Sequence, residues 1–141
     1  MTNDAARLGE AHALTRLLFR VVDRVQQDFS DVVAEAGLTP PLARMVLVLE
    51  TPQSMRALAD HLGCDASNVT GLTDRLASRG LVERVAGQDR RVRLVALTDE
   101  GRSVRAQLAT QVAAGSTVMR RLDASQRSAL RPLLEAILTS E

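Results

Sequence analysis

The sequence of 141 residues contains no Trp, no Tyr and no Lys, two Phe and a single Cys. Without tyrosine and tryptophan it lacks the aromatic platform on which proteins stack single-stranded nucleic acid. One cysteine cannot form an intrachain disulfide, as is typical of a reducing compartment. No apolar run reaches the roughly 18 to 20 residues of a membrane span, and Asp4, Arg7 and Glu10 stand where a signal peptide would be apolar. We therefore expect a cytoplasmic protein with no membrane partner.

The residues that are present are typical of one folded domain. Hydrophobic residues make up 45% of the chain and charged residues 25%, with a formal net charge of +1. All 18 basic residues are arginine. Codon usage in a GC-rich genome explains most of this preference, although a guanidinium also pairs with phosphate better than an ammonium group does. Residues 56–98 hold seven arginines and five acidic residues, so the basic segment lies in the middle of the chain.

The N-terminal segment has a helical repeat. Its apolar residues recur at steps of three or four over residues 4–35, and Gly37 then supplies a stop, which predicts one long helix. The stripe comprises Leu14, Leu18, Val21, Val25, Phe29 and Val32. Because a stripe this long in so small a chain needs a partner to cover it, we expect packing between two subunits.

The C-terminal segment predicts two further helices. Thr98 is the expected N-cap of a second long helix, whose apolar positions extend to Met119. Asp123 with Gln126 three residues later predicts a capping box for a last helix to about residue 139. Pro132 is expected to kink or divide that helix, because proline lacks the backbone N–H.

The middle of the chain predicts three short helices, each with its own cap or stop. They are residues 42–50 after Thr39, residues 55–62 between Ser54 and Gly63, and residues 66–79 between Asp65 and Gly80. The last two are joined by a tight turn that contains glycine, which is the arrangement of a helix-turn-helix whose second helix enters a DNA major groove. The alternative is a packed helical hairpin with no such function.

A basic hairpin follows the helix-turn-helix. Residues 81–85 and 93–97 are short β-prone runs, and Gly87 and Asp89 between them favour a chain reversal. A helix-turn-helix followed by such a hairpin is a winged helix. The expected fold is therefore mainly α with a small β-hairpin wing, in which residues 39–98 bind DNA and residues 1–38 and 99–141 form dimerisation helices.

Three segments in this order and spacing resemble the MarR family of bacterial transcriptional regulators: DASNVTGLTDRLASRGLVER at 65–84, DRR at 89–91 and VALTDEG at 95–101. The start LTP at 38–40 is also similar to the family's pattern. The resemblance covers nearly the whole chain. It implies a homodimer whose first and last helices interlace and display two winged helices to a palindromic double-stranded DNA site.

The resemblance also implies roles for single residues. The major-groove residues are Ser67, Asn68, Thr70, Gly71 and Arg75, and the wing contributes Arg90, Arg91 and Arg93, of which Arg91 reaches the minor groove. Asp89 is expected to orient the wing arginines. The chemistry agrees, because free amides at a helix N-terminus attract a phosphate and Gly71 lets the helix backbone approach the duplex. The alternative for Arg75 is an ion pair with Asp74 or Asp89.

Family members often bind small aromatic or phenolic anions in a cleft between the dimerisation helices and the DNA-binding region. The residues expected to line such an effector pocket here are His12, Arg16, Arg20, Arg44 and Met45. The alternative for each arginine is a solvated charge on a helix face. The resemblance therefore favours a repressor that a small-molecule effector releases from DNA.

Other functions are less well supported by the residues. His61 and Cys64 fall short of the three or four ligands of a zinc site, and we expect neither a metal nor a cofactor. The chain lacks a phosphate-binding glycine loop and a nucleophile elbow, so we do not expect an enzyme. Two alternatives stay open: a redox-responsive regulator that uses Cys64, and a winged-helix scaffold for protein interactions that does not bind DNA.

Overall fold

A computed structural model of the chain describes residues 2–139. Within these residues the helices are α1 (Thr2–Glu35), α2 (Pro40–Val48), α3 (Met55–Leu62), α4 (Ala66–Ser78), α5 (Asp99–Gly115), α6 (Thr117–Arg121) and α7 (Ala124–Leu138). The strands are β1 (Gln53–Ser54), β2 (Val82–Ala86) and β3 (Arg93–Leu97). The chain forms two compact units: unit 1 comprises the described parts of residues 1–29 and 113–141, and unit 2 comprises residues 30–112.

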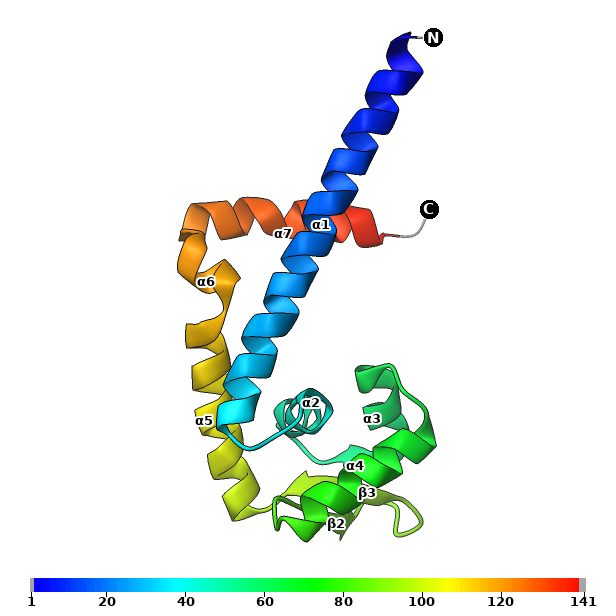
Figure 1. The fold of residues 1–141 in the computed structure, drawn as a ribbon. Coiled ribbons are helices and arrows are strands. Elements are labelled where there is room, and N and C mark those ends of the chain that lie inside the picture. The colour runs from blue at the N-terminus through cyan, green and yellow to red at the C-terminus, as the bar shows by residue number, and fades with distance from the viewer. Residues whose placement is uncertain (1, 140–141) are drawn as a thin grey trace. The chain divides into compact units, whose positions relative to one another are not determined.

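Unit 2 is a winged helix. Its antiparallel sheet has the order β1-β3-β2, and the register pairs Val82 with Leu97 and Ala86 with Arg93. Figure 1 shows α4, in green, lying across the hairpin of β2 and β3. The largest fully buried side chains of the core are those of Val33, Met45, Val46, Leu49, Leu58, Val69, Thr73, Leu76, Val95 and Leu108. The predicted fold, mainly α with a small β wing, is confirmed, and the short strand β1 is added to it.

Local capping explains where the helices of the helix-turn-helix begin and end. Ser54 Oγ accepts a hydrogen bond from the Ala57 amide at 3.1 Å, and Asp65 Oδ1 accepts one from the Asn68 amide at 2.9 Å. Gly63 between the two helices has φ +62, the left-handed conformation that glycine adopts without strain. Thr39 differs from the expectation, because it has N-cap backbone angles but no side-chain cap hydrogen bond.

The start of α5 is fastened to the loop between α4 and β2. Thr98 Oγ1 donates to the Gly80 carbonyl at 2.6 Å, and the Thr98 amide donates to the Leu81 carbonyl at 3.0 Å. A Cβ atom on Gly101 would lie 2.0 Å from that same Leu81 oxygen. Glycine is therefore the residue that lets α5 approach the backbone this closely.

The C-terminal helices differ from the expectation in two places. The predicted helix through Met119 is interrupted, because α5 ends at Gly115 and α6 begins at Thr117. Pro132 does not divide α7, which is continuous across it. The carbonyl that loses its donor belongs to Ser128, and Ser128 is exposed, so water can replace the missing amide. The predicted capping box of Asp123 and Gln126 is present, with hydrogen bonds of 2.8 and 3.0 Å.

Unit 1 exposes an apolar face. The predicted stripe of α1 is uncovered at Leu14, Leu18, Val21 and Val25, and α7 exposes Leu133 and Ile137. At the other end of the stripe, in unit 2, Val33 is buried while Val32 is only half-buried. None of the helices within residues 2–139 is both long enough and apolar enough to traverse a bilayer.

Candidate nucleic-acid interface

The first turn of α4 is held by one carboxylate. Asp65 Oδ1 accepts hydrogen bonds from the Asn68 amide at 2.9 Å and from Ser67 Oγ at 2.8 Å. The bond from the Asn68 amide, and then that from Ser67, lower the pKa of Asp65 below its ordinary value. The Asn68 amide is thus already occupied, so it is not one of the free amides expected to attract a phosphate. The side chains of Ser67 and Asn68 are exposed.

One face of α4 is polar and open, while the other is packed into unit 2. Val69, Thr73 and Leu76 are buried, and Thr73 Oγ1 donates to the Val69 carbonyl at 2.7 Å. The open face forms part of a concave surface between α2, α3 and α4, and the hollow that this surface encloses has a volume of about 390 Å³. Its lining residues are Pro41, Arg44, Leu62, Cys64, Ser67, Asn68, Gly71, Leu72 and Arg75. Four of the five predicted major-groove residues therefore share one surface.

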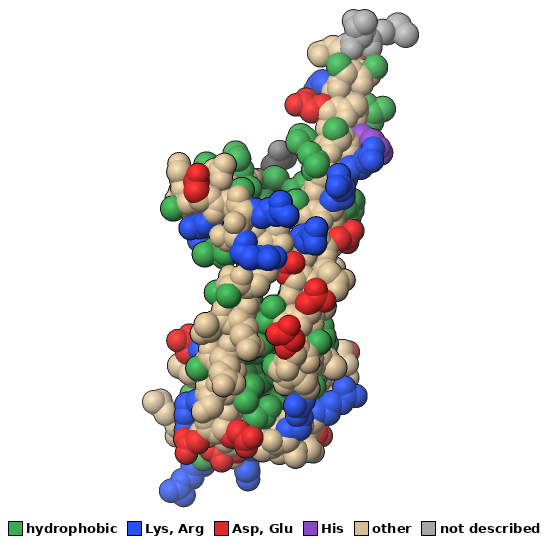
Figure 2. Space-filling model, turned by 60° about the vertical axis from the view of Figure 1, so that its left-hand side comes forward, with side chains coloured by type: hydrophobic (Ala, Val, Ile, Leu, Met, Phe, Trp, Pro, Cys, Tyr) green, Lys and Arg blue, Asp and Glu red, His purple; other side chains and the backbone are tan. Residues whose placement is uncertain are grey.

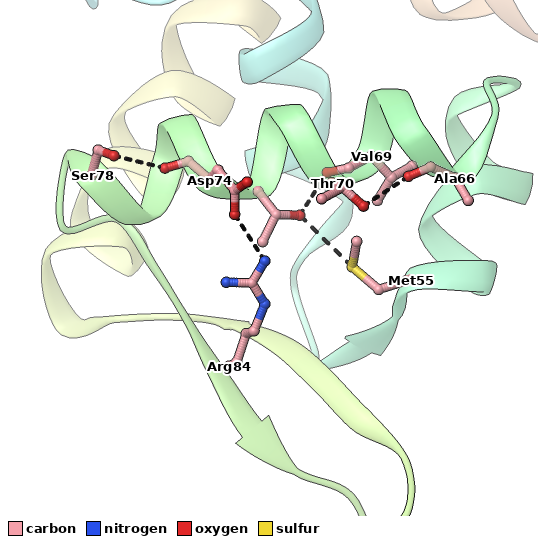
Figure 3. Close-up of polar contacts among 8 residues, drawn as sticks. Met55, Ala66, Val69, Thr70, Asp74, Ser78 and Arg84 are labelled. Carbon is pink, nitrogen blue, oxygen red and sulfur yellow. Dashed lines mark hydrogen bonds and ion pairs between the residues drawn. The ribbon is translucent and has the colours of Figure 1, made fainter.

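Thr70 is the predicted residue that lies outside this concave surface. Its side chain is exposed, and Thr70 Oγ1 donates to the Ala66 carbonyl at 3.0 Å (Figure 3). Gly71, by contrast, lies on the concave surface. A Cβ atom there would meet nothing within 4 Å, so the fold itself does not require glycine at this position. Glycine leaves this position on the open face of α4 without a side chain.

The wing is a tight hairpin with an ordered basic tip. The Gly87 amide donates to the Val92 carbonyl at 3.0 Å, and the Arg91 amide donates to Asp89 Oδ1 at 3.1 Å. Asp89 was expected to orient arginine side chains, whereas the hydrogen bond it accepts here comes from the Arg91 backbone. Arg90, Arg91 and Arg93 are all exposed. The carboxylate therefore shapes the backbone of the tip and leaves the guanidinium groups at the surface.

An ion pair joins α4 to the wing. Asp74 Oδ1 on α4 lies 2.9 Å from Arg84 Nη2 on β2, as Figure 3 shows. Since Asp74 pairs with Arg84, it does not make the ion pair that was the alternative for Arg75, which has no acidic partner within 4.0 Å among residues 2–139. No sequence period connects Asp74 with Arg84, so the pair was missed at the level of the sequence.

The expected effector residues fall in different places. His12, Arg16 and Arg20 are exposed on α1 in unit 1. Arg44 lies in unit 2, where it lines the concave surface beside α4. Met45 is 0% exposed in the core of unit 2, so its side chain does not reach any open surface. Cys64 is half-buried and lines the same surface as Arg44. Residues 2–139 contain no group of three or more potential metal ligands.

The comparisons with known proteins agree with this geometry. The model of the MarR family matches residues 49–92, from the end of α2 through the helix-turn-helix to the wing tip. A crystal structure of a MarR-family transcriptional regulator from a Rhodococcus species is 29% identical, with a TM-score of 0.72 over 90% of this chain and 93% of that one. The chain is thus similar to MarR-family proteins, through a matching central region and a shared fold.

Two other MarR-like structures are similar over most of their length. CouR from Rhodococcus jostii, bound to p-coumaroyl-CoA, is 26% identical with a TM-score of 0.72, covering 88% of this chain and 90% of CouR. A mutant MarR from E. coli complexed with operator DNA has the same fold, with 24% identity and a TM-score of 0.76 over 92% of this chain and 96% of that one. The comparison with curated proteins found no match.

Proposed function

We propose that this protein is a homodimeric MarR-family regulator that binds a palindromic double-stranded DNA site through α4 and the wing. The observation that carries the proposal is the open face of α4, where Ser67, Asn68, Gly71 and Arg75 line one surface of unit 2. The basic wing tip belongs to the same unit. A major groove about 12 Å wide admits a helix that presents such a face.

The side chains on α4 suit different tasks. An Asn amide can donate to and accept from an adenine edge, and an Arg fork can pair with guanine, so Asn68 and Arg75 are the proposed base readers. Gly71 lets the helix backbone approach the duplex. The hydroxyls of Ser67 and Thr70 already donate within the chain, so they are proposed to accept from a base amino group in the major groove. Specificity would then come mainly from α4.

The wing supplies charge. Arg90, Arg91 and Arg93 are exposed, and the Asp89 hydrogen bond orders the backbone at Arg91. An arginine held at the tip of a hairpin is suited to a narrow minor groove, where it responds to negative potential and groove shape. These contacts would add affinity at any sequence and make binding dependent on salt.

The exposed apolar faces of α1 and α7 support the homodimer. Leu14, Val21, Leu133 and Ile137 are uncovered in the single chain. Large exposed apolar faces are typical of subunit interfaces. A second copy that covers these faces would bring two winged helices together, as a palindromic site requires.

We further propose that a small organic anion regulates DNA binding and that the protein acts as a repressor. The p-coumaroyl-CoA bound to CouR supports a ligand of this kind. A ligand that binds one arrangement of the dimer more tightly shifts the population away from the arrangement that fits successive grooves. His12, Arg16, Arg20 and Arg44 remain the proposed anion partners, and Met45 is proposed only as the core beneath Arg44.

The two alternatives are a redox-responsive regulator and a protein-interaction scaffold, and only the first has an observation of its own. Cys64 lines the surface of α4 that carries the proposed base readers, so a redox-responsive regulator is the second candidate. A scaffold without DNA binding would use the same dimer but would need no basic wing. The scaffold would not account for the open face of α4 together with the wing arginines, whereas a redox-responsive regulator would use both.

The test is selection of bound duplexes from a random library by the purified protein at physiological salt. Enrichment of a palindrome with half-sites about one helical turn apart is the expected result. Arg91→Ala serves as the binding-defective comparison. If a folded, dimeric protein enriches no sequence under both reducing and oxidising conditions, the scaffold replaces the regulator as the best reading of the fold.

A further inference from the structure

The C-terminal end of α4 is joined to the turn that follows α1. Arg79, the C-cap residue of α4, donates a hydrogen bond from Nη1 to the Gly37 carbonyl at 2.7 Å. The two residues are 42 positions apart in the sequence. Exposed arginines are common on this protein, as the blue side chains of Figure 2 show. The distant backbone partner, rather than its exposure, therefore distinguishes Arg79.

The turn that accepts this hydrogen bond has a defined backbone geometry. Gly37 has φ +70, and the Leu38 amide donates to the Val33 carbonyl at 3.0 Å. Gly80, with φ +72, and the amide of Leu81 repeat this geometry at the end of α4. It is the Schellman motif, which satisfies the last carbonyls of a helix and fixes where the helix ends. Arg79 thus connects two well-defined helix ends.

The same end of α4 is also fastened to the start of α5. Thr98 Oγ1 donates to the Gly80 carbonyl at 2.6 Å. The end of α4 is therefore linked to the end of α1 through Arg79 and to the start of α5 through Thr98. Because unit 2 comprises residues 30–112, α1 and α5 are the two helices through which the chain enters and leaves this unit. Both chain connections of unit 2 are thus tied to one end of α4.

The hydrogen bond of Arg79 suits a role in orientation. The side chain is exposed, so its donor exchanges a water molecule for the Gly37 carbonyl and gains little net free energy. A guanidinium is planar and holds its N–H groups in a fixed fork, which defines the direction of the bond. α4 has 13 residues and is about 20 Å long. A tilt of about three degrees at its C-terminal end would move the first turn, which contains Asn68, by about 1 Å.

We infer that Arg79 is a positioning residue that fixes the direction of α4 and thereby the spacing of the DNA half-sites that the dimer accepts. The inference rests on the proposed function, since spacing matters only to a dimer that reads a palindrome. In this role Arg79 contacts no base and acts through the Gly37 carbonyl. With the bond intact, the two copies of α4 are held at one separation, which matches one spacing of half-sites. Without the bond the separation varies, and several spacings are accepted.

The first measurement is the affinity of the full chain for palindromes of different spacing. The duplexes are the selected palindrome, versions with one base pair added or removed between the half-sites, and an isolated half-site. Arg79→Met keeps an unbranched side chain without a donor, whereas Arg79→Lys keeps a charged donor. We expect the unmodified chain and Arg79→Lys to prefer the selected spacing at least tenfold, and Arg79→Met to prefer it less than threefold.

Arg131→Met is the matched control, because it removes the same charge from an exposed position of α7. We expect it to keep the tenfold preference for the selected spacing. Its affinity for the isolated half-site should equal that of Arg79→Met within twofold, since neither variant changes a proposed base reader. If Arg79→Met does not fold, as judged by circular dichroism, Arg79→Gln carries the same comparison, because its shorter side chain does not reach the Gly37 carbonyl.

The second measurement needs no DNA, so it separates failure of this inference from failure of the proposed function. Cys64 is the one cysteine of the sequence and lies in the turn between α3 and α4. Nitroxide labels on Cys64 of both copies report, by pulsed electron paramagnetic resonance, the distribution of distances between these turns. We expect the distribution in Arg79→Met to be at least twice as wide as in the unmodified chain and in Arg79→Lys.

Three results would overturn the inference. An undiminished spacing preference and an unchanged distance distribution in Arg79→Met would show that Arg79 does not position α4. An equal loss of affinity at every spacing, with a salt slope lowered by about 0.9, would assign Arg79 to a phosphate contact. A monomeric unmodified chain would have no spacing to set. If a dimeric chain enriches no duplex, the proposed DNA binding fails, and the label distances still decide whether Arg79 positions α4.

Discussion

Asp74 of α4 and Arg84 of β2 lie 2.9 Å apart between Oδ1 and Nη2, and this contact joins α4 directly to the wing. Their side chains are 60% and 42% exposed respectively. An exposed pair of this kind contributes about 0–1 kcal/mol to stability. We therefore expect the pair to affect the orientation of the wing relative to α4 more than the free energy of unfolding.

Neutralising either partner of this pair distinguishes orientation from charge. Asp74→Asn raises the net charge and Arg84→Gln lowers it, so a purely electrostatic role predicts opposite changes in DNA affinity. If the pair orients the wing, both variants weaken binding to the selected palindrome, and the swapped pair Asp74→Arg/Arg84→Asp recovers part of the loss. Fluorescence anisotropy with the selected duplex measures the affinities. Opposite shifts in the two single variants would reject the orienting role.

The variant Gly71→Ala is expected to change stability and DNA affinity in opposite directions. Because a Cβ atom at Gly71 meets nothing within 4 Å, alanine is expected to raise the free energy of unfolding by about 0.5–1 kcal/mol through its helix propensity. The same methyl group would stand between α4 and the duplex. It is expected to weaken DNA binding by about 1–3 kcal/mol, which is the usual cost of overpacking.

Gly9→Ala on α1 is the matched control for that variant, since a Cβ atom there also meets nothing within 4 Å. We expect it to be stabilised to a similar degree and to bind DNA normally. Chemical denaturation and DNA titration give the two quantities. Normal DNA affinity in Gly71→Ala would mean that the backbone of α4 does not approach the duplex at this position.

Arg91→Ala tests the wing by its dependence on salt. Removing one phosphate or groove contact lowers the slope of log affinity against log salt by about 0.9. Affinity at low salt falls as well, whereas Arg131→Ala on α7 is expected to change neither. Titrations at four salt concentrations supply the slopes. An unchanged slope and affinity would exclude Arg91 from the interface.

Gly101→Ala is expected to destabilise unit 2. Its Cβ atom would lie 2.0 Å from the Leu81 carbonyl oxygen, and that oxygen cannot move freely because it accepts from the Thr98 amide. The expected loss is about 1–3 kcal/mol or more, typical of overpacking against a fixed neighbour. Ser103→Ala, at an exposed position of α5, should be near neutral. Thermal unfolding of the two variants checks both, and equal melting temperatures would contradict the close approach.

Asp65 predicts a dependence of stability on acid. Its pKa in the folded chain lies below the ordinary value of 3.8, chiefly because the Asn68 amide donates to it. The stability that ionised Asp65 adds to the folded chain is therefore present above about pH 4. It is lost as the pH falls through the lower pKa that Asp65 has in the folded chain. Asp65→Asn keeps an oxygen acceptor but cannot titrate. The free energy of unfolding of the Asp65→Asn variant should fall less steeply between pH 4 and pH 2 than that of the unmodified chain. Chemical denaturation at several pH values measures both, and identical dependences on pH would contradict the prediction.

Residues close in sequence account for the features that could be predicted correctly. Ser54, Asp65 and Asp123 each cap an amide three residues further on, and Gly63 ends its helix in the left-handed conformation. These contacts depend only on neighbours along the chain, so residue type and spacing reveal them. The winged-helix order follows from the same signals.

Contacts between distant segments explain what the sequence left open. Asp28 and Thr117 are 89 positions apart, and no periodicity relates Asp74 to Arg84. β1 has two residues, too few to show alternation, and exists because β3 pairs with it. Pro132 leaves α7 undivided because the orphaned carbonyl belongs to an exposed residue. Exposure and long-range pairing are properties of the assembled chain.

The sequence by itself therefore determined most of the helices, the caps at Ser54, Asp65 and Asp123, the hairpin and the residues of α4 that are candidates for DNA contact. The tertiary structure decided which of these residues share a surface. It placed Ser67, Asn68, Gly71 and Arg75 together with Arg44, and it buried Met45 in the core. The physical reason is that a cap needs only a neighbour three residues away, whereas a surface is defined by which side of each helix the rest of the chain covers.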